Sequence, residues 1–278
     1  MKLRLGALDE LNARPLWFSL RMDPDVELIR DTRAGTTELL ERDRVDVSVV
    51  SVVKAAEAGW HRVPGIGIAA SRTLGSVLLL SDVKPWEASV IYAAQDSRTS
   101  TMLLLALLRR MGRNPSIIRL PAAEARAKAK LDRGSAALLI GDEAMKARSS
   151  FAESWDLAEA WNRRTGLPMV FGVWASRRPI TADVAQRLTA AAAQGEQQYA
   201  QIADHMADER WIARDAAAAY LHRLHYTLKP GDEVAVELLL TILQSYELIR
   251  LPAGATTLER THRDVLSWNQ DEDAVHYR

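Results

Sequence analysis

Hydroxyl-bearing residues gather in one short polar stretch, residues 95–100 (Gln-Asp-Ser-Arg-Thr-Ser). It lies between an apolar run, residues 90–94, and an amphipathic segment, residues 101–111. This order predicts a strand, a loop and then a helix, whose N-terminal N–H groups favour a bound anion. A guanidinium beside them suits a carboxylate. The residues concerned are Ser97, Arg98, Thr99 and Ser100. Both an anion site and an ordinary helix N-cap fit this stretch.

Other polar and mostly uncharged residues stand where the sequence predicts strand ends or strand-to-helix turns. They are Asn12, Ser51, Ser76, Gly141 and Asp142. In open α/β sheets this is the edge that binds ligands, so hydroxyls and backbone N–H groups there would recognise a small anionic molecule. Three roles stay open for Asp142: a helix cap, a pocket residue or a solvated side chain. Ser48, inside an apolar strand, is expected to bond a neighbouring carbonyl instead.

Composition and motifs exclude several kinds of chemistry. The 278 residues include 36 Lys and Arg and 36 Asp and Glu, so no basic excess favours nucleic acid. The absence of cysteine excludes disulfides, a thiol nucleophile and a Cys-ligated zinc site. Phosphate-binding glycine loops and the Gly-x-Ser-x-Gly nucleophile motif are also missing. The sequence therefore indicates no metal, no organic cofactor and no nucleic-acid partner.

Histidines offer no clear catalytic base. None of the six stands at a predicted strand end. His222 and His225 are spaced three apart on a predicted helix, but no His-Glu-x-x-His motif accompanies them, so we expect a pair on the helix surface.

Strands and helices alternate along the predicted chain. The expected strands are residues 3–7, 26–31, 45–53, 66–70, 76–80, 90–94, 116–120, 136–140 and 169–175. Everything after Pro179 is expected to be helical, ending in a polar, loosely held tail from residue 251. This alternation favours the α/β class. The N-terminus predicts a strand rather than a signal peptide, and no apolar run could span a membrane, so we expect a cytoplasmic protein with no membrane partner.

Several stretches, in this order, resemble the chorismate dehydratase family of the futalosine pathway of menaquinone biosynthesis. The matching stretches are Leu11-Asn12-x-x-Pro15-Leu16, Ser76-Val77-Leu78-Leu79, Ser97-Arg98-Thr99-Ser100, Leu138-Leu139-Ile140-Gly141-Asp142 and Thr165-Gly166-Leu167-Pro168-x-Val170-Phe171-x-Val173-Trp174. The resemblance implies the fold of type II periplasmic binding proteins, with two α/β lobes around a cleft and a helical C-terminal third. On this basis residues 1–87 and 176–278 are expected to form one lobe, and residues 88–175 the other.

The resemblance also implies a reaction, the conversion of chorismate to 3-[(1-carboxyvinyl)oxy]benzoate and water by a carbon–oxygen lyase. Its substrate is a small dianion. Asn12 is the expected catalytic residue, which would position the reacting ring while a substrate carboxylate takes the C3 proton. The expected substrate-binding residues are Ser51, Ser76, Ser97, Arg98, Thr99, Ser100, Gly141 and Asp142. A homodimer is compatible with the sequence.

Two alternatives remain. One is the related 1,4-dihydroxy-6-naphthoate synthase family, whose pattern has a catalytic histidine where this chain has Gly141. The other is a cytoplasmic protein that binds a small anion without chemistry. The chain also departs from the dehydratase pattern beside the expected cleft: Asp9-Glu10 replaces Ser-Tyr, and Ser51-Val52-Val53-Lys54-Ala55 replaces a Ser-Ser-Ile-Glu-Tyr type of segment.

Overall fold

The alternating strands and helices expected from the sequence form two units in the computed structural model, which describes residues 2–208, 211–252 and 268. The first unit comprises residues 1–71 and 170–232, and the second comprises residues 72–169 and 233–278. The sequence placed the boundaries at 87/88 and 175/176. The structure instead places residues 72–87 and 233–278 with the second unit and residues 170–175 with the first. Residues 77–81 belong to the second unit because they pair there with two other strands.

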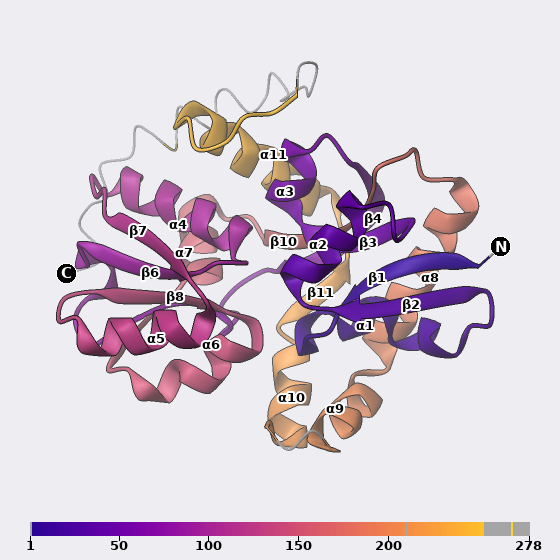
Figure 1. The fold of residues 1–278 in the computed structure, drawn as a ribbon, viewed down its shortest axis with the longest axis horizontal. Coiled ribbons are helices and arrows are strands. Elements are labelled where there is room, and N and C mark those ends of the chain that lie inside the picture. Colours follow the sequence, from indigo (N-terminus) through magenta and orange to yellow (C-terminus); the bar gives the residue numbers. More distant parts are fainter. Residues whose placement is uncertain (1, 209–210, 253–267, 269–278) are drawn as a thin grey trace. The chain divides into compact units, whose positions relative to one another are not determined.

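The first unit is built on a six-stranded mixed sheet in the order β11-β4-β10-β3-β1-β2 (Figure 1). Its strands are β1 (Leu3–Leu8), β2 (Val26–Asp31), β3 (Val47–Ser51), β4 (His61–Ala70), β10 (Met169–Ser176) and β11 (Leu224–Thr227). Its helices are η1 (Leu11–Ala13), α1 (Arg14–Trp17), η2 (Phe18–Met22), α2 (Arg33–Glu41), α3 (Val52–Glu57), α8 (Ala182–Gln197), α9 (Tyr199–Asp208) and α10 (Arg214–Leu221). Strands β1, β2 and β3 run parallel, whereas β10 is antiparallel to β3.

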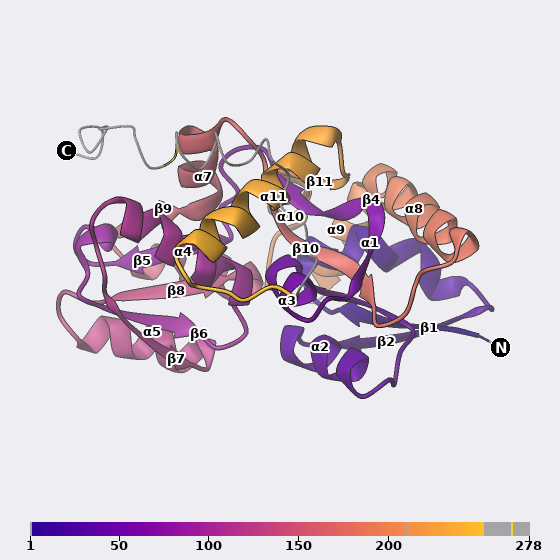
Figure 2. The ribbon, with the colours of Figure 1, turned by 90° about the horizontal axis from the view of Figure 1, so that it is seen from above.

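Helices cover both faces of this sheet (Figure 2). Helix α2 packs on β1 and β3, and there the Ser48 hydroxyl lies 3.2 Å from the Gly6 carbonyl and 2.8 Å from the Thr36 carbonyl. This confirms the expected structural role of Ser48. Helices α1 and α8 pack together on the other side, where the Trp17 indole donates to the Leu8 carbonyl at 3.0 Å.

The second unit has a five-stranded sheet in the order β7-β6-β8-β5-β9. Its strands are β5 (Val77–Ser81), β6 (Val90–Ala94), β7 (Ser116–Leu120), β8 (Ala136–Ile140) and β9 (Glu153–Asp156). Its helices are η3 (Pro85–Glu87), α4 (Arg98–Arg110), α5 (Ala122–Leu131), α6 (Gly141–Ala147), η4 (Arg148–Ser150), α7 (Leu157–Thr165) and most of α11 (Pro230–Ser245).

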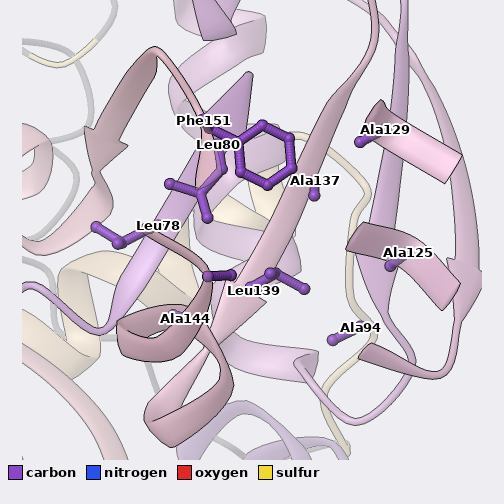
Figure 3. Packing of buried hydrophobic residues seen from close by; sticks show 10 residues of the cluster. Leu78, Leu80, Ala94, Ala125, Ala129, Ala137, Leu139, Ala144 and Phe151 are labelled. Atoms are coloured by element: carbon purple, nitrogen blue, oxygen red, sulfur yellow. The ribbon is translucent and has the colours of Figure 1, made fainter. Parts of the chain in front are cut away.

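The core of the second unit follows from two continuous apolar strands. All residues of β5 and β8 are buried, as their unbroken apolar runs predict for strands covered on both faces. Leu78 and Leu80 share one face with their partners Leu139 and Ala137 (Figure 3). Alanines of α5 and α6 pack on this face, so small side chains let the helices approach closely. Helix α7 packs on β5 and against α4.

Two expectations for the C-terminal third change. The region after Pro179 is not wholly helical: β11 pairs with β4 over residues expected to end a helix. His225 therefore lies on a strand, where its Nε2 is 2.8 Å from Asp232 Oδ1, and His222 follows α10. Most of the expected tail, together with His262 and His276, lies outside the described residues. None of the described helices is long and apolar enough to cross a membrane.

Candidate functional site

Most of the candidate residues lie at one edge of the second unit's sheet. Strands β6 and β8 run parallel, so their carboxyl ends, which lead to Ser97 and Gly141, lie at the same edge. Strand β5 is antiparallel to β8, so Ser76, just before β5, lies there too. The Gly141 N–H donates to the Ser76 carbonyl at 2.7 Å. The structure therefore gathers Ser76, Ser97, Arg98, Thr99, Ser100, Gly141 and Asp142 at this edge.

The N-terminus of α4 has no side-chain cap from Ser97. The Ser97 hydroxyl donates to the Ala94 carbonyl at 2.5 Å and lies 2.9 Å from the hydroxyl oxygen of Thr101. Ser97, Thr99 and Ser100 are all buried, and Arg98 is half-buried. The first N–H groups of a helix have no acceptor in a preceding turn, and the helix dipole makes them attractive to anions. The Ser97 hydroxyl thus stabilises the loop, and an anion here would meet the helix backbone and Arg98.

A buried aspartate that sequence reasoning did not single out holds this edge. Asp156 Oδ2 accepts the N–H groups of Leu74 and Gly75 at 3.0 and 2.6 Å, and Oδ1 accepts two N–H groups of the first turn of α7 at 3.0 and 3.1 Å. Burial raises the pKa of Asp156, against the opposing effect of these N–H bonds. Because residues 74–75 directly precede Ser76, Asp156 fixes the backbone there. Its signal in the sequence is an aspartate before a helix, a preferred N-cap.

The backbone conformation at position 141 favours glycine. Gly141 begins α6 with φ of 60°, a left-handed conformation that residues with a Cβ rarely adopt. This conformation turns the chain sharply after β8 while its N–H continues the pairing to Ser76. Glycine at this position therefore fits the observed turn on backbone grounds.

The other two candidates lie at the carboxyl edge of the first unit's sheet. Strands β1 and β3 are parallel, so the segments that follow them start from the same edge. Ser51 ends β3 and accepts the Lys54 N–H at 3.2 Å as the N-cap of α3. Asn12 lies in η1, and its buried Oδ1 has no hydrogen-bond partner among the described residues. Buried polar atoms are normally paired, so an unpaired one at a strand edge suits contact with a ligand.

The two carboxylates that depart from the family pattern are both matched by arginines. Asp9 Oδ1 lies 3.3 Å from an Nη of Arg14 and 3.7 Å from an Nη of Arg30. Glu10 forms an ion pair with Arg33. Arg14 is only 2% exposed, so its charge is compensated within the fold. The acidic pair therefore adds no uncompensated negative charge beside η1.

Sequence reasoning also missed two residues that touch the Asn12 segment from far along the chain. His205 of α9 places Nδ1 3.4 Å from Nη1 of Arg14, so one histidine does lie near the end of β1. The Tyr226 hydroxyl donates to the Asn12 carbonyl at 2.8 Å. Neither contact has a local signal in the sequence, because each joins residues about two hundred positions apart.

Comparison with known proteins gives consistent results. A family model described as menaquinone biosynthesis matches residues 3–245. The chorismate dehydratase of Thermus thermophilus is 26% identical over 254 residues, which cover 84% of this chain and 92% of that protein.

Solved structures agree on the fold. Protein AF1704 of Archaeoglobus fulgidus superposes with a TM-score of 0.71 at 14% identity, covering 89% of this chain and 98% of that one. The CA3427 gene product of Candida albicans, described as having the generic periplasmic binding protein fold, gives a TM-score of 0.55 at 12% identity over 96% of this chain and 95% of its own. The expected mixed α/β, periplasmic-binding-protein-like fold is confirmed.

Proposed function

Since the chain belongs to the menaquinone biosynthesis family, we propose that it is an enzyme of that pathway, a chorismate dehydratase. The observation that carries this proposal is the likeness to the Thermus thermophilus enzyme over most of both chains. The proposed reaction removes water from chorismate and yields 3-[(1-carboxyvinyl)oxy]benzoate. As the family resemblance implies, it would take place in the cytoplasm.

The proposed substrate anchors suit a dianion. The N-terminus of α4, over Ser97–Ser100, offers backbone N–H groups and the positive end of a thirteen-residue helix. The guanidinium of Arg98 begins that helix and can form paired hydrogen bonds to a carboxylate. In this proposal the remaining contacts to the substrate come from Ser51, Ser76, Gly141 and Asp142.

The proposed reaction is driven mainly by formation of an aromatic ring. Loss of the C3 proton and the C4 hydroxide releases one water and leaves an aromatic ring, which supplies a large driving force. In our proposal a carboxylate of the substrate accepts the C3 proton, and Asn12 hydrogen-bonds the reacting part of the ring. Its Oδ1 is buried without a partner among the described residues, so a donor from the substrate would complete its hydrogen bonding. Positioning of this kind lowers a barrier without a strong base.

Gly141 favours the dehydratase over the related naphthoate synthase. In the resemblance described above, the synthase pattern has a histidine base at this position. Here the residue has no side chain and adopts a left-handed φ of 60°. It therefore supplies a turn and a backbone N–H, but no base.

The direct test is to mix the purified protein with chorismate and to follow absorbance and mass. A dehydratase converts chorismate into an aromatic product that is lighter by one water. The Asn12→Ala variant, checked for folding by circular dichroism, controls for spontaneous decay of chorismate. Tight binding of chorismate without product would contradict the enzyme and support the anion-binding alternative.

A further inference from the structure

Tyr226 of β11 contacts Asn12 from a point where its strand is irregular. Strand β11 pairs with β4 in regular register at Leu224 and His225, and the register then shifts before Thr227. Tyr226 lies at this irregularity. Such irregularities interrupt the ladder of hydrogen bonds, change the direction of a side chain and often occur next to active sites.

A carboxylate binds the backbone at this irregularity. Glu196, near the end of α8, accepts the N–H groups of Tyr226 and Thr227 with one oxygen at 2.7 and 3.2 Å, and the Thr227 hydroxyl with the other at 3.2 Å. Bonds to an ionised acceptor are among the stronger hydrogen bonds in proteins. The irregular backbone at Tyr226 is thus specifically fastened to α8.

The Tyr226 side chain reaches the backbone of Asn12. The Tyr226 ring is fully buried and packs edge-on near the Tyr199 ring, with centroids 6.3 Å apart. Its hydroxyl donates to the Asn12 carbonyl at 2.8 Å. Burial raises the pKa of Tyr226, so the hydroxyl stays a neutral donor throughout the usual pH range.

Helix α8 also fastens the segment that follows Asn12. A Cβ placed on Gly195 would lie only 1.9 Å from the carbonyl oxygen of Pro15, so the two backbones are in close contact. Gly195 of α8 therefore contacts Pro15 directly, and the next residue, Glu196, binds the N–H group of Tyr226. Pro15 follows Asn12 in the chain, and the Tyr226 hydroxyl binds the Asn12 carbonyl.

We propose that Tyr226 is a positioning residue for Asn12: its hydroxyl holds the η1 backbone so that the Asn12 amide points toward the substrate. The inference deepens the proposed function and rests on it for the identity of the substrate. The Tyr226 hydroxyl binds the backbone carbonyl of Asn12 and not its side-chain amide. Loss of this hydrogen bond should therefore misplace the side-chain amide without removing it.

Tyr226→Phe tests this with little change in volume, and Tyr199→Phe is the matched control. The control removes a hydroxyl from the neighbouring buried ring and leaves the bond between Tyr226 and Asn12 in place. The chain has four asparagines, so ¹⁵N-asparagine labelling gives few side-chain amide signals, and Asn12→Ala identifies that of Asn12. We expect Tyr226→Phe to shift the Asn12 side-chain signal and Tyr199→Phe to leave that signal unchanged. An unmoved Asn12 signal in folded Tyr226→Phe would overturn the inference.

Kinetics with chorismate add a second readout. We expect Tyr226→Phe to lower kcat about tenfold with KM changed less than about twofold, because a misplaced reacting group lowers kcat more than binding. A kcat equal to that of Tyr199→Phe would count against the inference. If the wild type makes no product, the proposed function fails, and the Asn12 signal still decides the positioning. If Tyr226→Phe does not fold, Glu196→Gln loosens the same irregular backbone, and the same signal must move.

Discussion

The two sheet edges that hold the candidate residues are built in different ways. At the edge of the second unit the candidate residues come from the segment before β5 and from the starts of α4 and α6, and backbone bonds such as Gly141 to Ser76 hold them. At the edge of the first unit Asn12 lies in a single 3₁₀ turn that side chains from distant parts of the chain hold in place. The candidate residues at the second unit's edge are mostly uncharged. The surroundings of Asn12 at the first unit's edge include two carboxylates and three arginines.

In our proposal this difference separates most of the substrate binding from the chemistry. A backbone cradle tolerates loss of single side chains, because its donors are N–H groups. A side-chain amide that must meet a reacting ring depends on its support to within a fraction of an ångström. We therefore expect substitutions of Asn12 and of the groups that position it to lower kcat, and substitutions at the second unit's edge to act on stability or KM.

The largest expected effect is that of Asn12→Ala. It removes the proposed contact to the reacting ring, so kcat for chorismate should fall about a thousandfold, or about 4 kcal/mol of transition-state stabilisation. Because the anchors at α4 are untouched, chorismate binding measured by calorimetry should change less than about fivefold. Full dehydratase activity in this variant would show that the assignment of Asn12 is wrong.

Gly195→Ala should have the next largest effect, and on stability. Its Cβ would lie 1.9 Å from the Pro15 carbonyl oxygen, so α1 and α8 must move apart. Overpacking of this kind costs about 3 kcal/mol, measured as the free energy of unfolding in urea. Gly231→Ala is the control, because nothing lies within 4 Å of a Cβ there. Equal stability of the two variants would contradict the close contact of these helices.

The sequence is informative wherever a pattern is local. The apolar runs of β5 and β8 predict buried strands, which are present. The hydroxyl-rich segment 95–100 predicts a loop at a strand end, but the loop is shorter than expected, because α4 already begins at Arg98. Gly141 was also singled out, and its left-handed φ gives the physical reason for glycine there.

Contacts between distant segments could not be predicted in this way. The residues of β11 continue an apolar helical pattern, and only pairing with β4 makes them a strand. Tyr226 and Asn12 are 214 positions apart, so no spacing indicates their bond. The burial of Arg14 likewise depends on Asp9 and on the helices packed around it.

Asp156→Asn should have an intermediate effect at the second unit's edge. The amide keeps one acceptor and turns an NH₂ group toward a pair of N–H donors, so we expect a loss of about 2 kcal/mol in the free energy of unfolding. KM should rise, since the backbone before Ser76 is no longer held. An unchanged stability would mean that these N–H groups find other acceptors.

The pH dependence of the same variant has a definite sign. Burial raises the pKa of Asp156 above its ordinary value of 3.8, so the folded state binds this proton more tightly than the unfolded state. As the pH falls from neutrality toward 3.8, the wild type should therefore gain stability relative to Asp156→Asn. The comparison of the wild type with Asp82→Asn should have the opposite sign. The hydrogen bond from Lys130 lowers the pKa of Asp82, so the stability of the wild type relative to Asp82→Asn should fall as the pH falls through this lowered pKa.

The smallest expected effect is that of Ser97→Ala, and it sharpens the comparison most directly. The Ser97 hydroxyl is buried between the Ala94 carbonyl and Thr101, so its loss should cost about 1 kcal/mol of stability. The backbone N–H groups at the start of α4 remain, so KM and kcat for chorismate should stay within about twofold. Thr101→Val, which removes the other hydroxyl of the pair, should give the same result. A large rise in KM for Ser97→Ala alone would show that this hydroxyl, rather than the helix backbone, binds the substrate.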